Sequence, residues 1–330
     1  MASFAQFGRL ESAPPVIIHE MTDARCVFDV NNVDLSLANA LRRSMIAEVA
    51  TMTIDHVDVI ENSSILFDEF IAHRLGLVPL AVPHMEQFTD KTSCSCFDGC
   101  DHCCIVFELR AGFDFPPSTA SAEGEELPPI RVTARDLKPI SNTNVGVFLA
   151  GDSDPGIEIM RLKRGQRLHL KCIAYKGVGK VHAKWSPVGT ARFVRRPVIK
   201  LNESSLAKLE PEDKEAIAAS CPSRVFAYVE ESDKLVVERP DGCTFCRECL
   251  RKSEEIVRTK EAVSGIWRQR DRALLTVGER RDANNGALDV QFDVESTGSM
   301  PAVQIVRTGL SVLSSKIANI RAHFEAIVPQ

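Results

Sequence analysis

Apolar residues near the C-terminal end of the chain recur at alternating steps of three and four. Such steps form the a/d seam of a coiled coil, so Ser299–Ile327 is predicted to be one helix about 40 Å long. Ser299 can cap this helix, and Pro301 is tolerated in its first turn. The seam must be buried, either against the chain's own domain or, at its far end, against a second chain. Its members are Val303, Val306, Leu310, Leu313, Ile317, Ile320, Phe324 and Ile327.

Weaker patterns predict a strand–helix pair at each end of the chain. Near the N-terminus, Arg25–Val30 is typical of a strand, and Asp34 can cap a helix that runs through Val49. Near the C-terminus, apolar and polar residues alternate over Leu288–Glu295, which indicates a half-buried strand leading into the terminal helix. The segments between are mostly strand-like, with a further helix expected over Ser64–Leu75.

The fold class that follows is α+β. Neither terminal strand–helix pair has a neighbouring sheet of its own, so the economical arrangement joins them in one domain formed by residues 1–52 and 284–330. The remainder is then inserted between the two halves of that domain. We expect a mostly β domain over residues 53–197 and a small cysteine-bearing domain over residues 198–283.

Composition and charge narrow the setting of this fold. The chain has 330 residues, 44% of them hydrophobic and 26% charged, which is typical of a globular protein with two or three domains. No apolar run approaches the roughly 20 residues of a membrane span and no signal peptide is visible, so we expect no membrane contact and a place in the cytosol or nucleus. The net charge of −5 argues against a main task of gripping nucleic acid, although Arg161–Lys200 contains twelve Lys or Arg and no acidic residue.

Four cysteines of the middle segment have the spacing of a metal site. Cys94, Cys96, Cys100 and Cys103 form C-x-C-x₃-C-x₂-C, and eleven cysteines in a reducing compartment favour metal ligation over disulfides. Four thiolates can close a tetrahedron around one structural Zn²⁺, which leaves no open position for catalysis. Cys104 could replace Cys103 as the fourth ligand, although the x₂ spacing favours Cys103.

A second cysteine group lies farther along the chain. Cys243, Cys246 and Cys249 form C-x₂-C-x₂-C, and a Cys-Pro pair stands upstream at Cys221. A three-cysteine run with one Cys-Pro from elsewhere is what a single ferredoxin-type cluster needs, so the pattern predicts one [4Fe–4S] cluster held by these four cysteines. The same spacing also allows a second zinc ion or a site without metal.

Two long motifs resemble a known family. Residues 33–43 (VDLSLANALRR) and 68–80 (DEFIAHRLGLVPL) are similar to segments of the α-like subunits of DNA-dependent RNA polymerases, and residues 132–137 (VTARDL) and 182–187 (HAKWSP) add to the match. Together with the zinc loop, they resemble the third-largest subunits of eukaryotic RNA polymerase II. The resemblance covers both ends of the chain and most of its middle.

The resemblance implies an assembly role in the nucleus without catalysis. In this family, both chain ends form a dimerisation domain that pairs with a smaller α-like subunit. The heterodimer then seats the second-largest, catalytic subunit and two small zinc-bearing subunits. The Asp34–Val49 helix and the terminal heptad helix would therefore lie at the heterodimer interface, with little or no direct contact to nucleic acid.

The second cysteine group departs from the familiar polymerase II pattern. Its layout resembles the archaeal counterpart, which can carry a ferredoxin-like inserted domain, here residues 198–283. The departure keeps open the related α-like subunit that RNA polymerases I and III share. From other classes of protein, an iron–sulfur redox protein and a zinc-dependent nucleic-acid binder are the alternatives. For Arg161–Lys200, docking to an acidic face of another subunit is preferred, because Tyr175 and Trp185 are its only tyrosine and tryptophan.

Overall fold

The computed structural model describes residues 16–83, 85–97, 99–112, 128–140, 146–147, 154–264, 273–279 and 287–327. The chain forms two compact units, both of which mix helices and strands, as the α+β class predicts. The first unit contains Met1–Ile17, Asp29–Leu35 and Phe193–Gln291, and the second contains Ile18–Phe28, Ser36–Arg192 and Phe292–Gln330. The division into three domains made from the sequence stays a prediction.

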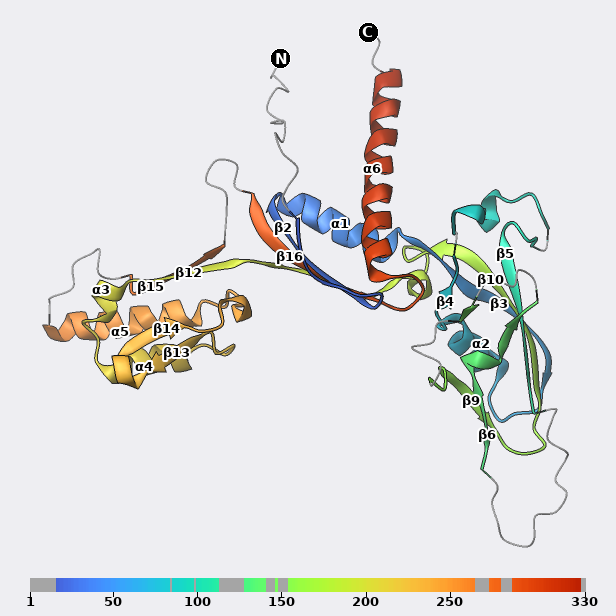
Figure 1. The fold of residues 1–330 in the computed structure, drawn as a ribbon, viewed down its shortest axis with the longest axis horizontal. Coiled ribbons are helices and arrows are strands. Elements are labelled where there is room, and N and C mark those ends of the chain that lie inside the picture. The colour runs from blue at the N-terminus through green and yellow to red at the C-terminus, as the bar shows by residue number, and fades with distance from the viewer. Residues whose placement is uncertain are drawn as a thin grey trace, which may run out of the picture. The chain divides into compact units, whose positions relative to one another are not determined.

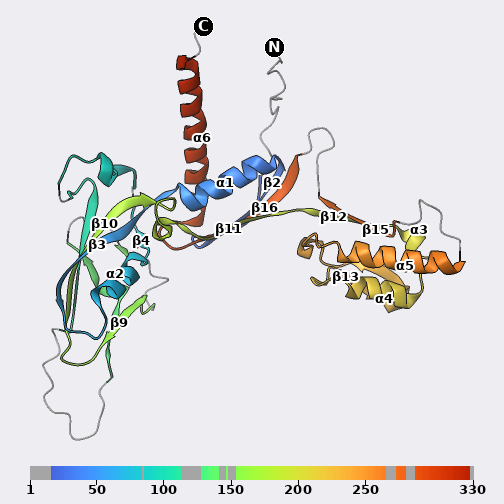
Figure 2. The same cartoon turned by 180° about the vertical axis from the view of Figure 1, so that it is seen from behind.

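Strands from the two ends of the chain form one sheet. Its order is β1-β2-β16-β11, so a strand near the N-terminus lies beside one near the C-terminus, as expected (Figures 1 and 2). Phe28 and Phe292 stack across the pair, with ring centroids 5.1 Å apart. The strands are β1 (Val16–Met21), β2 (Arg25–Val33), β16 (Leu288–Ser296) and β11 (Val188–Arg195).

Two helices follow the terminal strands and contact each other. They are α1 (Leu35–Ala47) and α6 (Ala302–Ile327). Gly309 of α6 fits closely against Met45 of α1, because a Cβ atom added to this glycine would lie 2.9 Å from the Met45 Cγ. The Ser44 hydroxyl donates to the Gly309 carbonyl at 3.0 Å. The glycine thus lets the two helices approach, in the middle of a helix where it would otherwise be unfavourable.

The terminal sheet carries an ion cluster around one buried carboxylate. Asp293 of β16, whose side chain is 9% exposed, accepts hydrogen bonds from Arg25 on β2 at 2.9 and 3.1 Å. Arg192 of β11 donates to the same carboxylate at 2.7 and 3.0 Å. The hydrogen bonds from Arg25, and then those from Arg192, lower the pKa of Asp293 despite its burial. One carboxylate therefore ties together three strands.

Replacing Asp293 by Asn should lower the free energy of unfolding by about 2 kcal/mol, because both arginines lose a charged acceptor. Glu295→Gln is the matched control: Glu295 is 48% exposed, lies 3.9 Å from the Arg25 Nε and should matter by less than about 0.5 kcal/mol. Because folding lowers the pKa of Asp293, its stabilisation is present above the ordinary value of 3.8 and is lost as the pH falls through the lowered value. Urea denaturation at several pH values measures both effects; equal losses in the two variants would contradict the prediction.

The β-rich part of the second unit is built on a sheet of order β3-β10-β5-β7. Its core contains fully buried residues such as Phe107, Leu75 and Met52, with α2 packed against β3. The elements are β3 (Ala50–Asn62), α2 (Asp68–Gly76), β4 (Leu80–Ala81), β5 (Cys104–Ala111), β6 (Ile130–Thr133), β7 (Leu137–Pro139), β8 (Gly146–Val147), β9 (Glu158–Leu162) and β10 (Leu168–Val178).

Helix α2 begins at Asp68, four residues later than the Ser64 start predicted from apolar spacing. The side chain of Asn62 explains the difference. It accepts from the Ser64 amide at 3.0 Å and donates to the Leu66 carbonyl at 2.9 Å, so these residues form a turn before the helix.

The first unit contains the second cysteine group within a small core of its own. Lys214 of α4 is almost fully buried, and its Nζ donates to the Asp233 carboxylate at 2.7 Å, which fastens α4 to the β13–β14 hairpin. The elements are β12 (Pro197–Leu201), α3 (Glu203–Leu206), α4 (Pro211–Ala219), β13 (Phe226–Val229), β14 (Lys234–Val237), α5 (Glu248–Ser264) and β15 (Leu275–Glu279). Among the described residues, none of the helices in either unit has the length and apolar character needed to span a membrane.

Candidate functional site

Helix α6 has two apolar faces that differ in burial. The face turned toward the fold contains Ala302, Ile305 and Gly309, all buried. The predicted heptad seam lies on another face, and its far half is exposed, with Ile317 59% and Phe324 67% accessible. Every described residue from Ser314 onward is exposed. The far half of the seam is therefore not sheltered by the described part of its own chain.

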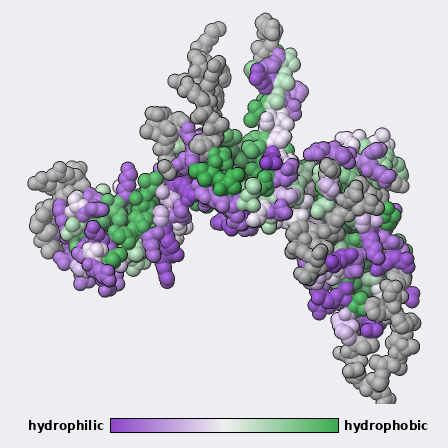
Figure 3. Space-filling model, in the orientation of Figure 1, coloured by the Kyte–Doolittle hydropathy of each residue, from purple (hydrophilic) through white to green (hydrophobic). Residues whose placement is uncertain are grey.

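Further apolar residues are exposed near the start of α1. Leu35 and Leu37 are each 43% accessible, and Ile18 and Met21 of β1 are more exposed still. Figure 3 shows apolar surface over α1 and the neighbouring strands, and apolar residues interspersed along α6. An exposed apolar area of this kind, on helices already paired with each other, is typical of a protein–protein interface.

The first cysteine group is gathered as a metal site requires. The sulfur atoms of Cys94, Cys96, Cys100 and Cys103 all lie within 4.8 Å of one another. The Cys94–Cys100, Cys96–Cys103 and Cys100–Cys103 pairs are 3.6, 3.4 and 3.8 Å apart. A tetrahedron with Zn–S bonds of about 2.3 Å has an edge of about 3.8 Å, so the spacing fits a four-thiolate ion. The residues present therefore fit a structural metal.

The loop lowers the pKa of one of these four thiols, that of Cys94. The backbone N–H and the thiol of Cys96 both donate to Cys94 and lower the pKa of Cys94 to about 7, while the pKa of Cys96 rises to about 12. The Cys100 amide donates to the Cys103 sulfur at 3.3 Å. Because a metal ion ligates the thiolate, a cysteine that ionises near neutral pH favours metal binding.

Cys104 lies outside this tetrahedron. It begins strand β5, opposite Tyr175 of β10, and packs under the loop. A Cβ atom on Gly99 would lie 2.8 Å from the Cys104 sulfur, and Gly99 has φ +100°, so glycine is needed at this bend on both grounds. Of the two candidates for the fourth ligand, the geometry brings in Cys103.

The second cysteine group is more open. Cys221 and Cys249 are buried in one apolar cluster with Cys243 packed against it, and Cys246 is exposed. Burial raises the pKa of Cys249 to about 11, and the neighbouring thiols of Cys221, Cys243 and Cys246 add to the rise. Among the described residues, only the first group meets the closeness of a single-ion site. The second group brings its four cysteines into one neighbourhood without that closeness.

The backbone of this second loop has an unusual conformation. Phe245 and Arg247, on either side of Cys246, have φ values of 57° and 63°, in the left-handed region that residues other than glycine rarely adopt. Two left-handed residues thus flank Cys246, the exposed member of the second cysteine group.

Comparison with known proteins gives the family. Residues 27–317 match the model of the RNA polymerase Rpb3/Rpb11 dimerisation domain. This chain belongs to the Rpb3/Rpb11 dimerisation family. The matched segment contains α1, both cysteine groups and α6 as far as residue 317.

Relatives within the Rpb3/Rpb11 family include subunits of RNA polymerase II. The chain is 35% identical over 319 residues to the DNA-directed RNA polymerase II subunit rpb3 of Dictyostelium discoideum (95% of this chain, 96% of the relative). It is 35% identical over 318 residues to subunit 3 of the RNA polymerases II, IV and V of Arabidopsis thaliana (93% and 90%). The Dictyostelium subunit rpac1 of polymerases I and III is 31% identical over 305 residues (88% and 76%). The resemblance to the third polymerase II subunit is thereby confirmed.

Sequence reasoning missed the inner face of α6. It assigned the apolar stripe to the seam, but the intramolecular contact uses Ala302, Ile305 and Gly309. The predicted Ser299 cap also differs, because α6 begins at Ala302, whose amide donates to the Asp23 carbonyl at 2.8 Å. A glycine within a helical pattern was the available signal for the close contact.

Proposed function

We propose that the chain is a non-catalytic assembly subunit of nuclear RNA polymerase II that pairs with a smaller α-like subunit. The observation that carries the proposal is the exposed far half of the seam of α6, on a helix that packs against α1 through Gly309 and Met45. Burying four large apolar side chains of the seam against a partner would contribute roughly 6–12 kcal/mol before ordering costs, enough for a stable complex.

Co-expression with the smaller α-like subunit of the same organism tests the pairing. The expected result is a stable 1:1 complex in size-exclusion chromatography with light scattering, while the chain alone self-associates or is poorly soluble. A monodisperse, stable monomer that does not bind the α-like subunit would overturn the proposal.

A second surface supports the role as a platform for the second-largest subunit. Phe67 and Phe70, at the start of α2, are 71% and 63% exposed, and Ile65 is more exposed still. Their rings contact each other 6.4 Å apart and face away from the core of the β-rich part. We assign this patch, which is remote in sequence from the dimerisation helices, to the docking of further polymerase subunits, including the small zinc-bearing ones.

The side chains of the basic stretch Arg161–Lys200 support a role without direct binding of nucleic acid. Its side chains largely serve the fold: Lys184 pairs with Asp55 at 2.6 Å, and Arg196 pairs with Asp29 at 2.8 Å. Trp185 and Tyr175 are buried, so neither offers an open ring face on which a base could stack. These contacts favour scaffold function over the zinc-dependent nucleic-acid binder considered from the sequence.

For the two cysteine groups, we propose one structural Zn²⁺ at Cys94, Cys96, Cys100 and Cys103, and one [4Fe–4S] cluster at Cys221, Cys243, Cys246 and Cys249. The zinc would fasten the loop to β5 and β10. The cluster can supply one-electron chemistry, but its proposed work here is to staple the loop before α5 to the end of α4.

Protein purified without oxygen should contain about four iron atoms per chain and show the broad visible absorption of a [4Fe–4S] cluster. Cys246→Ser should lose both, because it removes one of the four thiolates that hold the cluster. Pairing with the α-like subunit should persist. Cys26→Ala, which changes a buried cysteine of the terminal sheet, is the control and should keep the iron. Two zinc ions and no iron, or no metal at this group, would contradict the cluster. Loss of a reversible redox activity together with the iron would instead favour the iron–sulfur redox protein.

A further inference from the structure

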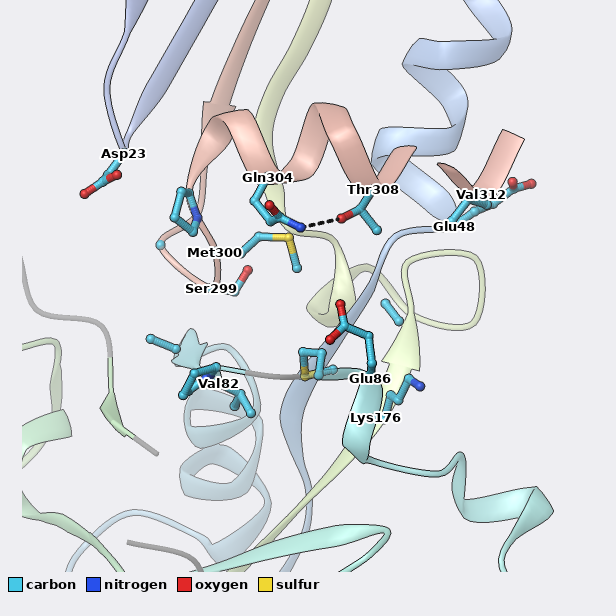
Figure 4. A pocket seen from close by; sticks show the side chains of 16 residues that line it. Asp23, Glu48, Val82, Glu86, Lys176, Ser299, Met300, Gln304, Thr308 and Val312 are labelled. Carbon is cyan, nitrogen blue, oxygen red and sulfur yellow. Dashed lines mark hydrogen bonds between the residues drawn. The ribbon is translucent and has the colours of Figure 1, made fainter. Parts of the chain in front are cut away.

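A groove lies in the second unit between the start of α6 and the segment that follows β4. Its volume is about 730 Å³, within the range of sites that enclose a ligand group. Figure 4 shows Gln304 and Thr308 of α6, together with Met300, facing Glu86 and Val82 across the space.

The α6 residues of this groove form a face distinct from the dimerisation seam. Gln304, Thr308 and Val312 are spaced by four, so they lie one above the other on one side of the helix. Ile317 and Phe324 lie on another side, and Ile305 points into the fold. A partner in the groove would therefore bind independently of a partner on the seam.

The floor of the groove is apolar and adaptable. Ala50, Val82 and Pro83 line it, together with the two methionines Met85 and Met300. Unbranched, polarisable methionine side chains adjust to apolar groups of different shapes. The floor suits an aliphatic or aromatic side chain, or the aliphatic stem of a lysine or arginine.

The rim of the groove is acidic. Among the described residues, no side chain donates to the carboxylates of Asp23 and Glu86, and one oxygen of Glu48 is buried without a hydrogen bond. The other oxygen of Glu48 accepts from Lys316 at 2.7 Å. Lys176, which also lines the groove, donates to the Phe88 carbonyl at 2.9 Å and is therefore engaged elsewhere. Of these three carboxylates, Glu48 is therefore paired through one oxygen, and Asp23 and Glu86 keep uncompensated charges beside the apolar floor.

From this complementarity we infer that the groove receives a segment of another polymerase subunit that presents a lysine or arginine beside an apolar side chain. The inference rests on the proposed function, since it places the chain in the assembled polymerase. The apolar side chain fills the space between Met85 and Met300, and the cation lies at Glu86. The cation also offsets the charge of Glu86, to which no side chain of the described residues donates a hydrogen bond.

Photo-crosslinking in the assembled polymerase tests the inference. The tagged chain carries Gln304→p-benzoylphenylalanine at the groove, or, as a control, the same residue at Arg307, which is exposed on α6 outside it. The polymerase is purified, irradiated and digested, and the adducts are identified by mass spectrometry. The groove position should crosslink to a segment of another subunit with a Lys or Arg next to an apolar residue, and the control should not give that adduct.

A charge comparison tests the rim. Glu86→Gln and Gln87→Lys raise the net charge equally, but only Glu86 lines the groove. Glu86→Gln should lower the yield of the adduct about two- to fivefold, the range for one partly exposed ion pair, and Gln87→Lys should leave it unchanged. The groove assignment would be overturned by any of four outcomes. These are no adduct above the control, an adduct to a segment without Lys or Arg, a small-molecule adduct, or equal changes in adduct yield for the two variants. A chain that does not copurify with polymerase subunits would overturn the proposed function and the groove with it.

Discussion

The double variant Ile317→Asp and Phe324→Asp should bind the smaller α-like subunit at least about 1,000-fold more weakly than the unchanged chain. Each of these side chains contributes about 1.5–3 kcal/mol when buried against a partner, and each aspartate must also be desolvated or kept exposed at the interface. A loss of more than about 4 kcal/mol corresponds to three powers of ten in the dissociation constant. Titration calorimetry, or size exclusion at falling concentration, measures the change.

The same helix supplies the control. Ser315→Asp and Ala322→Asp add the same charge at positions seven residues apart, as in the test pair, but on the opposite side of α6 from the seam. Both pairs are exposed in the chain alone, so neither should alter its fold, and circular dichroism should show equal helix content. If both double variants weakened binding equally, the interface would lie elsewhere; if neither did, pairing through the seam would be wrong.

The position of this seam was readable from the sequence because its period is long and regular. The face by which α6 contacts α1 was not, since Ala302 and Gly309 give no strong apolar signal. Their role depends on Met45, which lies in a different helix at the other end of the chain. Small residues are recognised as contact residues only when the neighbour that needs the space is known.

Two other features of the fold could not be predicted from apolar spacing, because they depend on local hydrogen bonds or on residues far apart in the chain. The late start of α2 follows from Asn62, a local signal that apolar spacing ignores. The cluster around Asp293 joins it to Arg25, 268 residues away, and no periodicity along the chain indicates such a pair. In contrast, the first cysteine group was visible because all its members fall within a short loop.

The choice between Cys103 and Cys104 as the fourth ligand depends on the folded structure more than on sequence spacing. Both follow Cys100 closely, and the sequence favoured Cys103 only by the usual gap between ligands. In the structure Cys104 is the first residue of β5. Cys103 precedes that strand, in the turn, and its sulfur atom lies within 4.8 Å of those of Cys94, Cys96 and Cys100, whereas Cys104 is not part of that group.

Replacing Cys103 by Ala should therefore remove the metal, whereas replacing Cys104 by Ala should leave it bound. A structural zinc site contributes on the order of 10 kcal/mol to the folding of the segment that holds it, so loss of one of four thiolates should unfold the loop. Zinc per chain, measured by elemental analysis after gel filtration, should fall from about one to near zero for Cys103→Ala. Limited trypsin digestion should then cut at Lys91, which in the folded loop lies over the Tyr175 ring at 4.0 Å.

The Cys104→Ala variant separates metal loss from a packing defect. Cys104 is as deeply buried as Cys103, so both substitutions remove a buried sulfur and should lower the thermal stability of the β5–β10 region by a similar packing contribution. Only Cys103→Ala should also be cleaved by trypsin at Lys91, as the unchanged chain should be after a chelator removes its zinc. If Cys104→Ala lost the zinc and Cys103→Ala kept it, the sulfur distances that assign Cys103 would be wrong. Equal retention in both would mean that three thiolates and another donor suffice.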